Sequence, residues 1–140
     1  MTNLFLDTNV IIDFLATREP FSLNAAILFE LAEKKKVNLF VSAVSFNTIY
    51  YILRQKFGHK ATLEVLDELS LLVSTLSVTG KIIKEALISG NTDFEDAIQY
   101  YTALSDTRIE VIVTRDVTGF KKSQLRVLRP DEITKFLPAI

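Results

Sequence analysis

The sequence predicts an α/β fold, a three-layer α/β/α sandwich with a central, mostly parallel sheet. Two observations predict this class. Short apolar segments alternate along the whole chain with longer segments in which apolar residues recur at helical spacing. Most of the short segments are uniformly apolar instead of alternating with polar residues, which is typical of strands buried on both faces of a parallel sheet.

The composition is that of a globular protein with one core. The chain has 140 residues, of which 49% are hydrophobic and 24% are charged, so we expect a single domain over residues 1–140. No apolar run approaches the roughly 18 residues of a membrane span, and Asp7 interrupts the apolar N-terminus, so we expect no membrane segment and no signal peptide. Cysteine is absent, which excludes thiolate catalysis and cysteine-based zinc sites and favours a cytoplasmic location.

Two strands and four helices are expected in the first half of the chain, at residues 3–7, 9–16, 22–35, 38–42, 44–57 and 60–73. The strands are the apolar runs “NLFLD” and “NLFVS”, and the helices show apolar residues three or four positions apart. Thr8 or Asn9 is placed to cap the first helix. Gly58 is a typical end for the third helix.

The second half repeats this alternation, with strands at 75–79, 110–114 and 126–128 and helices at 80–89, at 94–106 and from Pro130 onward. “EVIVT” is the most strand-like run of the chain because it is rich in β-branched residues. Gly90 closes the helix at 80–89. Pro130 suits the first turn of the last helix, where its missing N–H costs nothing.

Acidic residues stand at the predicted carboxyl ends of the strands. Asp7 ends the first strand, Asp116 follows “EVIVT”, and Asp93 and Asp96 open the helix at 94–106. In open α/β sheets the site lies beyond the carboxyl ends of the strands, so we expect these side chains at one edge. Carboxylates held together repel one another unless a cation neutralises them, and such oxygen ligands suit Mg²⁺ or Mn²⁺. These ions can activate water and hold a phosphodiester.

Each acid also has a purely structural interpretation. Asp7 could cap the helix that follows it, and Asp116 could be a turn residue. Asp93 precedes Asp96 by three residues, as in a capping box, and an acid in the first helical turn is favourable in any case. Asp13, inside the first helix, is expected to be solvated or hydrogen-bonded.

Four segments contain these acids and their neighbours: “LFLDTNVIIDFL”, “DFEDAIQYYTAL”, “VIVTRDVTGF” and “VLRPDEI”. In this order and at these separations they resemble the PIN-domain ribonucleases, especially the VapC-type toxins of toxin–antitoxin pairs. The second segment is similar to the family's helix with a metal-binding acid. The third is similar to its strand followed by Thr-x-Asp or Thr-x-Asn. The resemblance covers essentially the whole chain and implies a PIN-like fold.

The resemblance also implies an activity and partners. It implies an endoribonuclease that uses Mg²⁺ or Mn²⁺ and hydrolyses RNA phosphodiesters with a metal-activated water. Asp7, Asp96 and Asp116 match catalytic, metal-coordinating positions, and Asp93 matches a position where an extra acid is often found. Thr114 matches the small hydroxyl residue beside the site. The implied partners are an RNA substrate, a cognate antitoxin and a second copy of the chain in a homodimer.

One position departs from the family pattern. Members usually have a glutamate on the helix after the second strand, and in “SAVSFNTIYYIL” this position falls at Asn47 or, as the better match, Thr48. Gly119 also stands where an acid often precedes the aromatic residue. The loss of about one ligand charge weakens the hold on a hard cation. We therefore leave three outcomes open: low activity, a metal site completed by substrate phosphate, or no activity. Asn47, Thr48, Thr114 and Asn9 are supporting candidates.

Basic residues near the predicted site could bind RNA. The formal net charge of −1 provides no global attraction to nucleic acid, so contacts must rest on local clusters. Arg115, Lys121 and Lys122 flank Asp116 and are candidates for phosphate contacts, with ordinary surface charge as the alternative.

Two further residue types carry weaker expectations. His59, the only histidine, follows Gly58 at a helix break and is expected to be a solvated loop residue, which disfavours a histidine general base. The tyrosine pairs at 50–51 and 100–101 each place one ring on the apolar stripe of a helix. The other ring could lie at the surface or an interface, or stack on an RNA base.

Two other functions are weighed against the nuclease. A PIN-like RNA- or protein-binding module with weak or no catalysis would explain the missing glutamate. A phospho-acceptor or phosphatase-like domain is disfavoured, because the strand at 75–79 has no acceptor aspartate and Asp7-Thr8-Asn9 lacks the second acid of an Asp-x-Asp motif.

Overall fold

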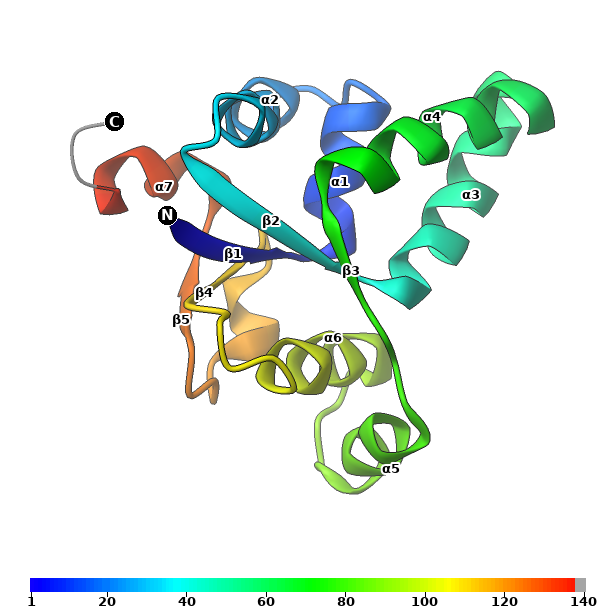
Figure 1. The fold of residues 1–140 in the computed structure, drawn as a ribbon. Helices are drawn as coiled ribbons and strands as arrows, with labels where there is room; N and C mark the ends of the chain where they lie inside the picture. The colour runs from blue at the N-terminus through cyan, green and yellow to red at the C-terminus, as the bar shows by residue number, and fades with distance from the viewer. Residues whose placement is uncertain (138–140) are drawn as a thin grey trace.

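A five-stranded sheet with helices on both faces forms the centre of the computed structural model, which describes residues 1–137 (Figure 1). Every strand pairing is parallel, and the strand order is β3-β2-β1-β4-β5. The strands are β1 (Thr2–Leu6), β2 (Val37–Ser42), β3 (Ser74–Leu76), β4 (Val111–Val113) and β5 (Arg126–Leu128). The predicted α/β class with a parallel sheet is confirmed.

The strand order reverses direction between β1 and β4. From β1 the chain adds β2 and β3 on one side, then crosses to add β4 and β5 on the other. Leu6 pairs with Val113, and the amide of Asp7 donates to the carbonyl of Val113 at 2.9 Å, so β1 and β4 end at the same edge. Such a reversal is where ligands bind in doubly wound sheets.

The helices form two layers of unequal size. One face of the sheet is covered by α1, α2, α3, α4 and α7, and the other by α6 and a 3-10 turn, with α5 on the outer side of α6 (Figure 1). The bounds are α1 (Thr8–Leu15), α2 (Ser22–Glu33), α3 (Ala43–Phe57), α4 (His59–Leu72), α5 (Gly80–Ile88), α6 (Phe94–Leu104), η1 (Val117–Phe120) and α7 (Pro130–Phe136). No helix within residues 1–137 has the length and apolar character that crossing a membrane would need.

Alternate residues of β1 enter two different cores. Leu4 and Leu6 belong to the cluster under α1, α2 and α3, whereas Phe5 belongs to the cluster under α6, with Phe40 and Ile112. All five side chains are buried. Because successive side chains of a strand point to opposite faces, burial on both faces explains why β1 is uniformly apolar.

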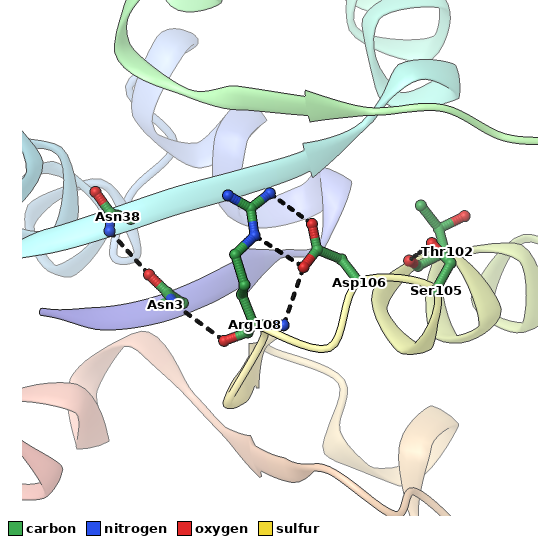
Figure 2. Close-up of polar contacts among 6 residues, drawn as sticks. All are labelled: Asn3, Asn38, Thr102, Ser105, Asp106 and Arg108. Carbon is green, nitrogen blue, oxygen red and sulfur yellow. Dashed lines mark hydrogen bonds and ion pairs between the residues drawn. The ribbon is translucent and has the colours of Figure 1, made fainter.

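Polar side chains join the strands at the amino edge of the sheet, opposite the end of β1 (Figure 2). Arg108, on the connection from α6 to β4, donates to both carboxylate oxygens of Asp106, at 3.0 and 2.7 Å. Its carbonyl accepts a hydrogen bond from the Asn3 side chain at 3.0 Å, and Asn38 donates to Asn3 at 2.8 Å. These contacts tie the starts of β1 and β2 to the segment that leads into β4.

Three local expectations are corrected. The first strand ends at Leu6 instead of Asp7, and the N-cap of α1 is Asp7 and not Thr8 or Asn9, because the Asp7 carboxylate already accepts from the Thr8 amide. The strand expected at 75–79 ends at Leu76, since the chain must leave the sheet for Thr79 to cap α5.

His59 is the third correction. It is the first residue of α4, not a loop residue, because Gly58 adopts a positive φ of 82° that lets α4 begin directly after α3. Its Nδ1 lies 2.8 Å from the hydroxyl of Tyr50. The imidazole therefore joins α3 to α4.

Candidate active site at the carboxyl ends of the strands

Asp7 is both a helix cap and a buried acid at the end of β1. Its side chain is only 4% exposed. Oδ1 accepts from the Thr8 amide and Oδ2 accepts from the Thr114 hydroxyl, each at 2.8 Å. Burial raises the pKa of Asp7 above its ordinary value, the two hydrogen bonds lower it in part, and the charges of Glu95 and Asp116 raise it further. Capping therefore does not exclude a functional role for Asp7.

Asp93 and Asp96 lie at the amino-terminal end of α6. Asp93 is the N-cap, and its Oδ1 accepts from the Asp96 amide at 3.0 Å. Burial raises the pKa of Asp96 to about 7, and the charges of Asp7, Asp93 and Asp116 contribute to this rise. Burial is the larger cause of this raised pKa, and the neighbouring acids add to it because like charges disfavour the ionised carboxylate.

Asp96 and Asp116 meet over Gly119. Asp116 lies on the turn between β4 and η1, where its Oδ1 accepts from Thr118 at 2.6 Å. A Cβ atom at position 119 would lie 2.3 Å from Oδ2 of Asp96 and 3.4 Å from Oδ2 of Asp116. Glycine is thus required for both carboxylates to occupy this space, and the acid often found at this position in the family could not be accommodated without moving Asp96.

The Thr114 side chain connects Asp7 and Asp116 by hydrogen bonds. The hydroxyl is fully buried, donates to Asp7 Oδ2 at 2.8 Å and accepts from the Asp116 amide at 3.0 Å. It therefore holds the turn with Asp116 at a set position relative to the end of β1. This geometry is consistent with the expected role of Thr114 beside the site.

Arg115 forms its ion pair with Asp13 and not with an acid of the candidate site. Its guanidinium donates to the carboxylate of Asp13, with Nε–Oδ2 at 2.6 Å and Nη2–Oδ1 at 3.1 Å. It also lies over the ring of Phe21, 3.9 Å from the centroid. Asp13 is buried and not solvated, and Arg18 approaches it at 4.0 Å. Arg115 therefore has a structural role, and its contact with RNA phosphate stays a prediction.

A buried polar network that the sequence did not indicate lies beside Asp7. Gln99 of α6 donates from Nε2 to the hydroxyls of Thr8 and Ser45, each at 3.1 Å, and these two hydroxyls are 2.7 Å apart. All three side chains are buried, and Gln99 Oε1 has no partner within the described part of the chain. The sequence signal that could have indicated this network is Gln99, a polar residue between Ile98 and Tyr100 on an apolar helix. The network joins α6 to α1 and α3.

The remaining supporting candidates are Asn9, Asn47 and Thr48. Asn9 and Asn47 are exposed, and Thr48 is half-buried. No side-chain hydrogen bond of these three residues is found within residues 1–137. From α3, Ser45 is the side chain that reaches the polar network, one turn before the position where the family glutamate is expected.

A cavity of about 760 Å³ opens beside the acids. Asp93, Asp96 and Asp116 line it, and Asp7 lies buried outside the lining. Seventeen residues form its wall, including both lysines expected to bind phosphate, Lys121 and Lys122, which are exposed. Three of the four predicted acids and two of the three predicted basic side chains thus line one cavity.

The acids fit a hard divalent cation in part. Among residues 1–137, no three acid, histidine or cysteine side chains converge closely enough to coordinate one ion together. No Lys or Arg of this range forms an ion pair with Asp7, Asp96 or Asp116. Mg²⁺ is commonly bound by one or two carboxylates with waters and substrate phosphates, which Asp96 and Asp116 over Gly119 can supply.

Comparison with known proteins identifies the family. The family model of the PIN domain matches residues 3–118. The chain belongs to the PIN domain family. The match includes all four acids of the candidate site, and it confirms the resemblance inferred from the sequence motifs. No protein with a curated function matches this PIN domain in sequence.

Solved structures share the fold at low identity. VapC20 from Mycobacterium tuberculosis, described as a sarcin-ricin loop cleaving toxin, is 17% identical, with a TM-score of 0.65 over 85% of this chain and 94% of that chain. A toxin–antitoxin complex from Klebsiella pneumoniae gives 18% identity and 0.66, over 91% and 97%. VapBC2 from Rickettsia felis, bound to promoter DNA, gives 16% and 0.65, over 91% and 98%. These matches show the same fold.

Proposed function

We propose that this PIN domain is a Mg²⁺- or Mn²⁺-dependent endoribonuclease and the toxin of a toxin–antitoxin pair. The observation that carries the proposal is the uncompensated pair of Asp96 and Asp116 over Gly119, with Asp7 beside it, at the strand reversal of a PIN fold. A structure of the same fold is described as a sarcin-ricin loop cleaving toxin, which supports the substrate class.

Asp96 and Asp116 would hold the ion directly, and Asp7 and Asp93 would add negative charge around it. A bound Mg²⁺ or Mn²⁺ supplies an activated water and neutralises charge on the phosphodiester. The chain's own residues contribute by holding the acids in position. Thr114 and the Thr8 amide orient Asp7 by hydrogen bonds, and such bonds favour the ionised carboxylate.

Two lysines are placed to hold the RNA backbone. Lys121 and Lys122 follow η1 directly, line the same cavity as Asp116, and are exposed. Phosphate contacts of this kind orient a nucleic acid without reading its sequence. The lysines are therefore expected to lower KM more than they raise kcat.

The proposed partners are a cognate antitoxin and a second copy of the chain, in the cytoplasm. The Klebsiella relative in fold is a toxin–antitoxin complex. The paired helices α3 and α4 also expose large apolar side chains, including Tyr51 at 54%, Leu63 at 48% and Leu71 at 81%. Exposed apolar clusters favour protein–protein contact.

Cleavage of a labelled RNA tests the nuclease. The wild-type protein should cleave with Mn²⁺ or Mg²⁺ and stop when a chelator is added, whereas Asp96→Asn and Asp7→Asn should lose about 100-fold or more in rate. Asp67→Asn, an exposed acid of α4, is the matched control and should cleave normally. Equal cleavage by Asp96→Asn and the wild type would remove these acids from the mechanism.

A binding module without useful catalysis is the second candidate. The observation in its favour is that the position of the family glutamate carries no acid, with Asn47 exposed and Thr48 half-buried. Calorimetry distinguishes the two functions. RNA binding without Mn²⁺ binding and without turnover supports the module, and Mn²⁺ binding with turnover supports the nuclease.

A further inference from the structure

The cavity beside the acids continues along α6 to two tyrosines that the proposed chemistry does not use. Tyr100, Tyr101 and Leu104 line it together with Asp96. Tyr100 follows Asp96 by four residues, so it lies on the same face of α6 and about 6 Å further along the helix axis. Leu104 extends this face by another turn. An aromatic and apolar wall therefore begins one helical turn from the acids.

The two tyrosine rings are held differently. The Tyr100 hydroxyl accepts from the amide of Gln124 at 3.0 Å, and its ring packs on the cluster around Phe5. Tyr101 meets Tyr100 edge to face, with centroids 5.2 Å apart at 70°. Tyr101 also lines a second cavity, of about 520 Å³, beside α5. The half-buried Tyr101 ring packs in part on the cluster of Ala86, Ala97 and Ile98. Within residues 1–137 its hydroxyl has no hydrogen-bond partner, so the exposed part of Tyr101 is available to an added ring.

Basic and polar residues also line the cavity. They come from the segment after η1, with Lys121, Lys122 and Ser123, and from the loop before α6, with Asn91. Neither lysine forms an ion pair within the described part of the chain. An aromatic platform in the same cavity as basic side chains is the combination that binds single-stranded nucleic acid, because bases stack while phosphates are neutralised.

We propose that this cavity binds an unpaired base of the RNA, that of the nucleotide next to the cleaved phosphate, stacked on Tyr101. The volume of about 760 Å³ lies in the range of pockets that enclose a small organic molecule. The inference rests on the proposed ribonuclease function and deepens it, since a base within a duplex stack cannot reach a ring inside a cavity.

Fluorescence titration without a divalent ion, in chelator, tests base binding apart from cleavage. The probe is a single-stranded RNA of about ten nucleotides with 2-aminopurine at each position in turn. The wild type should quench one position. Tyr101→Ala and Tyr101→Leu should bind about 5- to 100-fold more weakly, because both lack the ring, whereas Tyr101→Phe should stay within about twofold. Leu87→Ala, at an exposed apolar residue of α5 outside the cavity, is the control and should bind normally.

An abasic nucleotide at the quenched position separates stacking from a structural role of the ring. Removing the base should weaken wild-type binding, and it should weaken Tyr101→Leu no further, because two groups that interact show non-additive losses. Additive losses, or equal binding by Tyr101→Leu and the wild type, would overturn the base site and leave the ribonuclease proposal standing. Absence of any RNA binding and cleavage by the wild type would overturn both.

Discussion

Arg115 and Asp13 form a two-pronged ion pair between the β4–η1 turn and the middle of α1, with hydrogen bonds of 2.6 and 3.1 Å. Asp13 is fully buried, and Arg115 immediately precedes Asp116. The helix that starts at the Asp7 cap is thus tied to the turn that bears Asp116. Two acids from distant parts of the chain are held by this pair as well as by Thr114.

Breaking this ion pair should destabilise the fold. Arg115→Leu leaves the Asp13 carboxylate buried without its main partner, which costs about 3 kcal/mol, since removing one partner of a buried pair is more costly than replacing both. Urea unfolding monitored by circular dichroism measures the loss. The double variant Asp13→Leu with Arg115→Leu should recover part of it. Unchanged stability of Arg115→Leu would show that the pair contributes nothing.

Adding one methyl group at Gly119 should disable the site without unfolding it. A Cβ there would lie 2.3 Å from Asp96 Oδ2, so the carboxylate must swing away from Asp116. We expect Gly119→Ala to lower Mn²⁺ affinity about tenfold or more, with unfolding free energy changed by about 1 kcal/mol or less. Calorimetry and thermal melts measure the two effects. Gly80→Ala, where nothing lies within 4 Å of the added atom, is the control and should bind Mn²⁺ normally.

Stability without metal should fall as the pH rises through neutrality. The pKa of Asp96 is raised from 3.8 to about 7 in the folded state, so the folded protein holds this proton more tightly than the unfolded chain. The resulting stabilisation is full below pH 3.8 and is lost as the pH approaches and passes 7. Thermal melts in chelator from pH 4 to 8 measure this loss.

Asp96→Asn removes this titration. At pH 8 the variant should melt about 2–4 °C higher than the wild type, a modest gain because solvent screens a half-exposed group. At pH 4 the two should melt together. Mn²⁺ at pH 8 should raise the melting temperature of the wild type and not that of the variant. Identical pH profiles for the two proteins would contradict the assignment to Asp96.

The buried hydroxyl network should tolerate complete replacement better than partial loss. Gln99→Leu leaves the hydroxyls of Thr8 and Ser45 without their amide donor, at a cost of about 1–3 kcal/mol. The triple variant with Thr8→Val and Ser45→Ala removes the unpaired groups as well and should be more stable than Gln99→Leu alone. Chemical denaturation compares the three proteins. A triple variant less stable than the single one would count against this account.

Local patterns predicted the sheet and the placement of the acids. Uniformly apolar runs such as “NLFVS” were sufficient to predict the strands, because a strand buried on both faces does not alternate between apolar and polar residues. The sequence could not decide whether Asp7 caps α1 or belongs to the site, and in the structure Asp7 caps α1 while its other oxygen accepts from Thr114. The sequence offered Arg115 as a candidate RNA contact and did not reveal its ion pair, because the partner Asp13 lies 102 positions away. The space over Gly119 likewise depends on tertiary contacts.

The strand order also sets when the protein can act during synthesis. β4 is the neighbour of β1, yet more than a hundred residues separate Asp7 from Asp116 along the chain. A nascent chain that has left the ribosome only as far as α5 lacks β4, α6 and both acids that meet over Gly119. The two acids over Gly119 can therefore meet only after the chain up to η1 has emerged, because α6 and the β4–η1 turn that carry them are late elements of the sequence.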